Sequence, residues 1–176
     1  MIMIELIEPD EKYLQSYIEA YNEYVDNHIK TYAFKDAGSM DIFAMFDDFR
    51  NERDLRPGLV GESTYWLVDS ENTRFIGEIS IRHRLTDKLL LRGGHISYGV
   101  RCSEWGRGYG TQMLAMALEK AKELGISSVL ITCNDDNIAS ARVIEKNGFV
   151  LADKVEAMAF IEGKNVLTRR YWKTIL

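Results

Sequence analysis

The stretch VRCSEWGRGYGTQML, residues 100–114, decides the fold class of this 176-residue chain. It leads from an apolar, strand-like segment into a helix, and three glycines stand at alternate positions where the helix begins. Glycine costs about 1 kcal/mol relative to alanine inside a helix, so its repetition here needs a reason. Glycines at a helix N-terminus let backbone N–H groups converge on an anion, which the helix dipole also favours. The other interpretation is a tight strand-to-helix turn without a ligand, and these residues alone leave both open.

The flanking residues predict one α/β domain over residues 1–176, with a mixed central sheet. Short apolar or β-branched runs indicate strands, and apolar residues at helical spacing indicate helices. A loop of hairpin length, which contains Gly93 and Gly94, joins the predicted strands at 74–85 and 94–102. The predicted order is β-α-α-β-β-β-α-β-α-β-β. Strands are expected at 2–7, 63–69, 74–85, 94–102, 127–133, 149–157 and 168–176, and helices at 9–25, within 40–53, from the glycines to 124, and at 136–147.

Composition excludes several classes of protein. The net charge of −5 argues against nonspecific nucleic-acid binding. We find no signal peptide and no apolar run of the ~20 residues that span a bilayer, so we expect a cytoplasmic protein that does not contact membranes. Cys102 and Cys133 lack metal or redox spacing and are expected to be free thiols, and no metal site is predicted. Residues 1–60 carry 13 acidic and six basic side chains, which favours a cationic ligand on that half, although solvated helix faces explain the same pattern.

Three classes of anionic ligand compete for the glycines. A Walker loop needs Lys followed by Ser or Thr after the last glycine, and Thr111 follows it directly. A dinucleotide site needs a third glycine where Thr111 stands, although Asp135 and Asp136 come about where a ribose-binding acid would lie. The third class is acyl-coenzyme A.

For this third class the sequence resembles a known family, the GNAT superfamily of N-acyltransferases. VRCSEWGRGYGTQML resembles its R/Q-x-x-G-x-G/A signature, with Gly108 and Gly110 at the two glycine positions. NIASARVIEKNGF (137–149) resembles its second signature, an Asn, a small residue and then E-K-x-G-F. GGHISYGVR (93–101) and VLITCNDDNIAS (129–140) are similar to a group of bacterial predicted acetyltransferases. The predicted element order is also the order of that superfamily.

Three residues depart from the family pattern. Trp105 stands where the signature has Arg or Gln, and Cys102 stands where the most similar group has Pro. Ile144 replaces a Tyr that many members use as a general acid for the leaving thiol. A thiol with a pKa near ~8.5 leaves as a thiolate without much help, so we expect the chain to tolerate that loss.

The resemblance implies acetyl-CoA as co-substrate, held between the strand that ends at Arg101 and the strand 127–133. The backbone of Tyr98 and Val100 would pair with pantetheine as with a peptide, and the N–H near Val100 would polarise the thioester carbonyl. Asn137 and Ser140 would contact the pantetheine or phosphate arm. The pyrophosphate would be held by Arg107, Gly108, Tyr109, Gly110 and Thr111.

A base must take the proton of the acceptor amine, which arrives protonated. Glu78 is the first candidate because it shares a strand face with Ser80 and Arg82, and superfamily members often keep a Glu on this strand. An ion pair between Glu78 and an arginine is the structural alternative. His95 is the second candidate, because its pKa suits the task, and it could instead cap the turn at 93–94. The tyrosines at 13, 17, 21, 24 and 32 are interpreted as core and rim.

Three functions of different class remain. The first is an N-acetyltransferase that moves acetyl from acetyl-CoA to a primary amine of a small molecule or peptide by direct attack. The second is a non-catalytic acyl-CoA-binding or sensing domain, for which Trp105 and Ile144 argue. The third is a Rossmann-like dinucleotide binder. Exposed edge strands of the expected sheet leave room for a homodimer.

Overall fold

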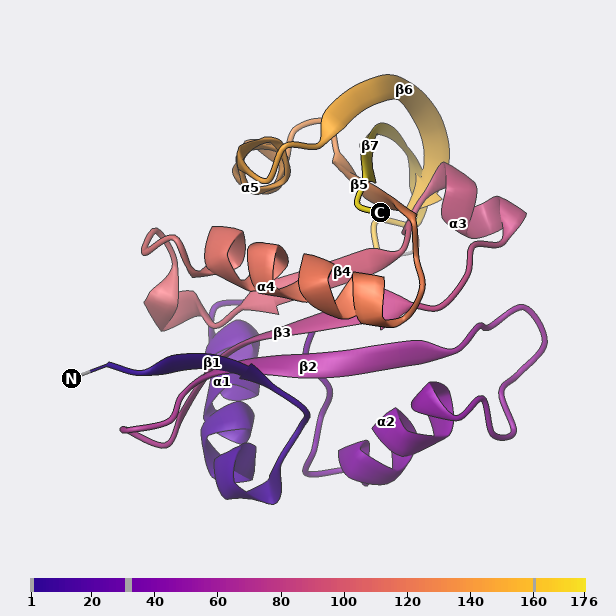
Figure 1. Ribbon diagram of the computed structural model, residues 1–176. Helices are drawn as coiled ribbons and strands as arrows, with labels where there is room; N and C mark the ends of the chain where they lie inside the picture. Colours follow the sequence, from indigo (N-terminus) through magenta and orange to yellow (C-terminus); the bar gives the residue numbers. More distant parts are fainter. Residues whose placement is uncertain (1, 31–32, 160) are drawn as a thin grey trace.

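The computed structural model describes residues 2–30, 33–159 and 161–176, and its strands form two antiparallel sheets (Figure 1). The first sheet has the order β1-β2-β3-β4, and the second has the order β5-β7-β6. Every described strand pair is antiparallel, so the parallel βαβ units of a dinucleotide-binding domain are missing and that alternative is wrong. The strands are β1 (Ile4–Ile7), β2 (Glu62–Asp69), β3 (Arg74–Arg82), β4 (Ile96–Val100), β5 (Ser128–Asn134), β6 (Val150–Ala159) and β7 (Lys164–Thr174).

Helices cover both faces of the first sheet (Figure 1). On one face α1 and α2 enclose an aromatic core with Trp66 and Phe75, and on the other face α4 encloses an aliphatic core with Ile79 and Ile81. Alternation along β3 thus sends Ile79 and Ile81 to α4 and Glu78 to the side of α1 and α2. The helices are α1 (Leu14–Asp26), α2 (Ile42–Arg50), α3 (Asp87–Leu91), α4 (Tyr109–Glu123) and α5 (Ile138–Lys146), with 3-10 turns η1 (Glu11–Tyr13) and η2 (Cys102–Glu104).

The buried face of α1 is aromatic. Tyr17 and Tyr24 are buried, with Tyr13 just before the helix, whereas Val25 is 52% exposed. The apolar spacing of Leu14, Tyr17, Ile18, Tyr21 and Val25 predicts a buried stripe that ends on Val25, so the predicted stripe is one residue out of phase at its end. Tyr21 lies at the rim, and Tyr32 lies outside the described residues.

The connection between β3 and β4 differs from the expected hairpin loop because it contains α3. The Thr86 side chain caps this short helix by accepting a hydrogen bond from the backbone N–H of Leu89 at 3.3 Å. Gly93 and Gly94 follow with φ values of 111° and 62°, which turn the chain back into β4.

The two sheets meet at His95, just before β4. Its backbone N–H donates to the carbonyl of Leu130 in β5, and its Nδ1 accepts from the N–H of the same residue, at 2.8 and 3.0 Å. Beyond this contact the described parts of β4 and β5 form no ladder. The opening between them lies beside the first turn of α4. No helix in the described ranges has the length and apolar character needed to cross a membrane.

Candidate active site

The glycine stretch forms an open concave turn before α4. Gly106 and Gly108 have φ values of 77° and 83°, in the left-handed region that glycine adopts without strain. Nothing lies within 4 Å of where a Cβ would stand on either residue. Left-handed residues on both sides of Arg107 are the backbone pattern that turns successive N–H groups toward one point.

The first turn of α4 adds donors to this turn. Gly108 is the N-cap and has no side chain to cap the helix, so the N–H groups of Tyr109, Gly110 and Thr111 are not satisfied by it. The Arg107 side chain is exposed and lies 3.2 Å from the Glu104 carboxylate, which also pairs with Arg74. Two arginines therefore balance one buried carboxylate beside the turn, and the local charge favours an anion.

The backbone of β4 offers an open edge on the same side of the molecule. Arg101 N–H donates to Ile76 and Arg82 N–H donates to the carbonyl of His95, so odd-numbered residues of this segment pair with β3. In an antiparallel ladder the intervening residues point their backbone groups the other way. Tyr98 and Val100 thus direct their N–H groups away from β3, toward the edge where none of the described strands pairs with β4.

The carbonyl of Val100 is held by two side chains that the sequence analysis did not place there. The Tyr24 hydroxyl donates to it at 2.6 Å, and the Trp105 indole Nε1 donates at 2.7 Å. The Tyr24 and Trp105 rings also meet edge to face, with centroids 6.1 Å apart. The tryptophan at the first signature position therefore bonds the protein's own β4 edge. Both donors hydrogen-bond the Val100 carbonyl. The N–H is therefore the backbone group of Val100 that faces the opening between β4 and β5.

Residues at the start of α5 close the opposite side. Asn137 is the N-cap of α5, and its side chain accepts from Ser140 N at 3.1 Å. The Ser140 hydroxyl is 2.9 Å from the Tyr98 hydroxyl, so this pair bridges β4 and α5. Cys133 on the neighbouring strand β5 is a buried free thiol.

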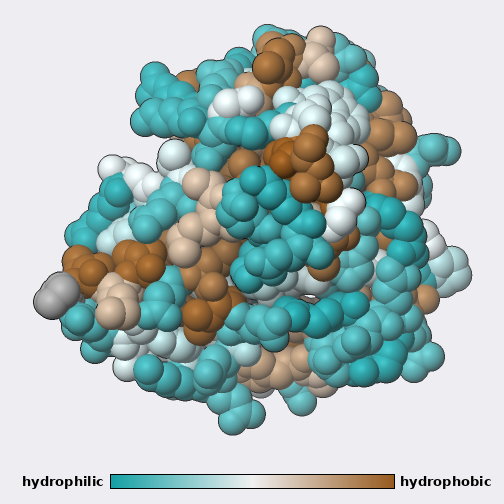
Figure 2. Space-filling model, viewed as in Figure 1, coloured by the Kyte–Doolittle hydropathy of each residue, from teal (hydrophilic) through white to brown (hydrophobic). Residues whose placement is uncertain are grey.

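Gly110 leaves space between these elements. A Cβ built on it would point to Val143 of α5 and to Tyr98 and Val100 of β4, at 3.4 to 3.9 Å. The missing methyl group thus widens the gap between α4, α5 and β4. The space-filling view shows a hollow between α5 and the turn before α4 (Figure 2). An extended arm that ends in a pyrophosphate fits this arrangement, because the arm can pair with β4 while the phosphates reach the glycine turn.

A cavity on the other face of β3 contains Glu78. We call it the α2–β3 cavity; it measures about 120 Å³ and reaches Ser97 and Tyr98 of β4. Met45, Phe46 and Phe49 of α2 form an apolar wall. The remaining lining residues are Ala33, Lys35, Glu62, Glu78, Ser80 and Arg82.

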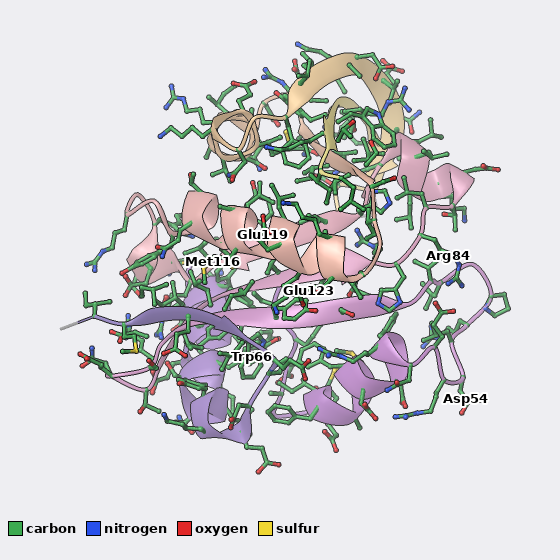
Figure 3. All side chains as sticks on the ribbon, viewed as in Figure 1. Asp54, Trp66, Arg84, Met116, Glu119 and Glu123 are labelled. Atoms are coloured by element: carbon green, nitrogen blue, oxygen red, sulfur yellow. The ribbon has the colours of Figure 1, made fainter. Side chains whose placement is uncertain are left out.

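Glu78 is only 4% exposed and is held by aromatic donors. The Trp66 indole Nε1 donates to its Oε2 at 2.9 Å, and the Tyr17 hydroxyl lies nearby. Trp66 lies between α1 and α2 beneath β2 (Figure 3), where Tyr17 stacks on it at 4.8 Å. Burial raises the pKa of Glu78 to about 8, although Trp66 and Lys35 oppose the shift. A group with this pKa changes its protonation state in the range that proton transfer near neutral pH requires.

The structural alternative for Glu78, an ion pair with Arg82, does not occur. Arg82 lies 3.3 Å from the Glu62 carboxylate and donates to the carbonyls of Gly93 and Gly94. His95 does not line the α2–β3 cavity, and its Nδ1 is used in the contact with Leu130. Burial, together with the charge of Arg82, lowers the pKa of His95. The structure therefore separates the two candidate bases.

Comparison with known proteins assigns the family. A family model described as the acetyltransferase (GNAT) domain matches residues 8–150. The chain belongs to the GNAT acetyltransferase family. No curated protein matches the sequence. In the ranges that the structure covers, no group of three or more His, Cys, Asp or Glu side chains is placed to hold a metal ion.

Solved structures share the GNAT fold at low identity. The microcin C7 self-immunity acetyltransferase MccE, in complex with acetyl-CoA and AMP, is 20% identical with a TM-score of 0.72, over 97% of this chain and 92% of that chain. RimL, a ribosomal L7/L12 α-N-protein acetyltransferase in complex with coenzyme A, is 16% identical with a TM-score of 0.70, over 97% and 93%. The protein yncA from Salmonella typhimurium, with its cofactor acetyl-CoA, is 18% identical with a TM-score of 0.65, over 98% of this chain and 94% of that chain. These likenesses confirm the GNAT fold.

Several residues of the candidate site were missed from sequence. Tyr17 and Tyr24 lie on α1 and Lys35 lies between α1 and α2, in segments without a motif, and only tertiary packing brings them to β3 and β4. The α2 wall carried a usable signal, because Met45, Phe46 and Phe49 recur at helical spacing. Periodicity alone does not distinguish a cavity wall from a core face.

Proposed function

We propose that this chain transfers an acetyl group from acetyl-CoA to a primary amine by direct attack on the thioester. The observation that carries the proposal is a buried carboxyl group, Glu78, in a cavity that reaches β4 from the side opposite the glycine turn. Acetyl-CoA on one side of β4 would then meet the acceptor amine on the other side. The family and the acetyl-CoA-bound neighbours support this reading.

Binding of the donor is assigned to main-chain groups. The first-turn N–H groups of Tyr109, Gly110 and Thr111, with Arg107 and Gly108, would hold the pyrophosphate. Tyr98 and Val100 would pair with the pantetheine amides, and the Val100 N–H would stabilise negative charge on the thioester oxygen during attack. Asn137 and Ser140 would line the arm from α5, although both side chains already make the internal hydrogen bonds described above.

Glu78 is assigned as the base. The amine nitrogen forms the new C–N bond as the C–S bond breaks, its extra proton passes to Glu78 directly or through water, and coenzyme A leaves as the thiolate. We prefer Glu78 to His95 because Glu78 lines the α2–β3 cavity and His95 does not.

Calorimetric titration with acetyl-CoA, with NAD as control, tests the donor site. We expect micromolar binding of acetyl-CoA and none of NAD. Failure to bind acetyl-CoA would overturn the proposal. Binding without turnover for any amine in a broad panel would favour the non-catalytic sensing domain instead.

The pH dependence of turnover tests the base. Since the pKa of Glu78 is raised to about 8, we expect kcat/KM to rise with pH until the carboxyl group is ionised above that value. Glu78→Gln should lower kcat by about 10²–10⁴-fold and leave acetyl-CoA affinity unchanged. A variant with wild-type kcat and the same pH profile would exclude Glu78 as the base.

A further inference from the structure

We infer that Tyr24 and Trp105 act together as positioning residues for the thioester. Both side chains hydrogen-bond the carbonyl oxygen of Val100, and in doing so they hold the Val100 N–H toward the acetyl donor. We call the two side chains and this carbonyl the Val100 clamp. The inference rests on the proposed function, which assigns the Val100 N–H to the thioester oxygen.

The clamp occupies the Val100 carbonyl fully. The Tyr24 hydroxyl donates to it at 2.6 Å, and the Trp105 Nε1 donates at 2.7 Å. A carbonyl oxygen has two lone pairs, so this oxygen has no place left for an amide N–H of the pantetheine arm. Val100 therefore presents only its N–H to a donor in the opening between β4 and β5. A lone N–H suits a thioester oxygen, which accepts hydrogen bonds and donates none.

The clamp also takes the place of a neighbouring strand at the end of β4. Val100 is the last residue of β4, and none of the described strands pairs with its outer edge. On the inner edge the Arg101 N–H donates to the carbonyl of Ile76 at 2.9 Å. The peptide group between Val100 and Arg101 is planar, so it is fixed at both its oxygen and its N–H. Without the clamp only the inner bond would remain, and the peptide plane would be free to tilt.

Each donor of the clamp is anchored on a different element. Tyr24 is buried on α1, and the neighbouring Glu23 pairs with the buried Arg101 guanidinium at 2.5 Å. Trp105 directly follows η2 and precedes the glycine turn. Its ring is 54% exposed, so burial explains its position poorly, whereas the bond to Val100 and the edge-to-face contact with Tyr24 explain it. The clamp thus joins α1, β4 and the glycine turn.

The clamp should act on the reaction more than on binding. The pyrophosphate is assigned to N–H groups of the first turn of α4, which the clamp does not contact. A fixed donor stabilises the charge that develops on the thioester oxygen during attack, and removal of one such donor costs about 10²–10³-fold in kcat. A tilted N–H should lose part of this effect. With hydroxylamine as a small acceptor and acetyl-CoA saturating, we expect kcat to fall about tenfold in Tyr24→Phe and in Trp105→Phe.

The carbon-13 resonance of acetyl-CoA labelled at the thioester carbonyl tests the clamp without any acceptor. A hydrogen bond to this oxygen polarises the carbonyl and moves its carbon resonance downfield. We expect this shift when the wild-type protein binds labelled acetyl-CoA, and a loss of at least half of it in Tyr24→Phe and in Trp105→Phe. Both changes keep an aromatic ring and remove the donor. Calorimetry should give both variants an acetyl-CoA affinity within about threefold of the wild type.

Two further variants serve as rescue and control. Trp105→Gln supplies a new donor, because its amide nitrogen lies the same number of bonds from Cα as the indole Nε1. It should therefore recover part of the shift that Trp105→Phe loses. Tyr21→Phe makes the same change as Tyr24→Phe on the same helix, but at the rim and outside the clamp. It should leave the shift, kcat and acetyl-CoA affinity unchanged.

The outcomes separate this inference from the proposed function. A wild-type shift or a wild-type kcat in both phenylalanine variants would overturn the inference and leave the acetyltransferase in place. Parallel losses of shift and affinity would mark a purely structural role and would also overturn it. Absence of a shift in the wild type, with acetyl-CoA bound, would remove the Val100 N–H from the thioester and overturn the inference. Failure of the wild type to bind acetyl-CoA would overturn both.

Discussion

Glu78 occupies a position where a carboxyl group is costly to bury. The Trp66 indole donates to it, and the charge of Lys35 partly opposes the effect of burial on its pKa. Arg82, on the same strand, pairs with Glu62 and donates to the carbonyls of Gly93 and Gly94. At the scale of single residues, burial therefore brings the pKa of Glu78 into the range that a base requires.

We expect this burial to appear in the pH dependence of stability. The folded pKa of Glu78 lies above the unfolded value of 4.5, so the folded protein binds more protons between pH 4.5 and about 8 and loses stability as pH rises through that window. At 1.36 kcal/mol per pH unit, the shift is worth at most about 5 kcal/mol. Glu78→Gln has no carboxyl group to titrate there. The free energy of unfolding of Glu78→Gln in urea, minus that of the wild type, should therefore increase between pH 5 and pH 9.

A matched carboxyl-to-amide change on β2, Glu62→Gln, controls for the general effect of removing a charge. Its side chain is 23% exposed, so it should not reproduce the gain. Parallel wild-type and Glu78→Gln curves would contradict the assigned burial.

The environment of Glu78 could be predicted from sequence only in part. Alternation along 74–82 places it with Ser80 and Arg82 and opposite Ile79, as the structure has it. The residue of β2 that lies opposite Glu78 could not be found by counting back from the turn between β2 and β3. Pairing starts at Asp69–Arg74, and an irregularity between Leu67 and Val68 shifts the register by one residue. Simple counting would set Trp66 against Gly77 instead of Glu78.

At the scale of elements, the start of α4 combines poor helix formers with an open surface. Gly110→Ala should keep or raise the melting temperature, since alanine favours a helix by about 1 kcal/mol and the new methyl makes only ordinary contacts. The same methyl points into the gap toward Val143 and Tyr98, so acetyl-CoA affinity should fall at least tenfold.

Calorimetry together with thermal unfolding checks this separation of stability from binding. Gly125→Ala is the control at the other end of α4, where φ is 76° and an alanine is strained. It should lower the melting temperature and spare acetyl-CoA affinity. A Gly110→Ala protein that binds acetyl-CoA as tightly as wild type would remove Gly110 from the site.

Long elements were predictable and short ones were not. The helical spacing of Leu114, Ala117, Leu118, Ala121 and Leu124 predicts one buried stripe on α4. The first four are buried, whereas Leu124 at the C-cap is 38% exposed. The five residues of α3 provide little more than one turn, too few for a period to show. The phase error at Val25 arises because tyrosines fill both faces of α1, and only packing against Trp105 and Phe34 selects Tyr24.

At the scale of the whole molecule, the contact at His95 is one of several that join the two sheets. His95→Ala would leave the Leu130 N–H without its partner and should cost about 1–3 kcal/mol in urea unfolding. His95→Asn keeps an acceptor and should cost less. Equal stability of the two variants would contradict this role.

The same contact has a pH dependence of opposite sign to that of Glu78. Burial lowers the pKa of His95 below its ordinary 6.5, so its contribution is present above that value and is lost as pH falls through the folded pKa. The stability difference between wild type and His95→Asn should shrink in acid. This long-range junction carries no local sequence signal, so the contact between His95 and Leu130 could not be predicted from sequence.

The indole N–H of Trp66 has one more consequence. It donates to a carboxyl group that titrates near neutrality, so its chemical shift should follow the ionisation of Glu78. The chain has only three tryptophans, so three indole resonances are expected, and Trp66→Phe would assign the one in question. An isotope-labelled sample titrated through pH 8 would thus report on the base by magnetic resonance without any acceptor.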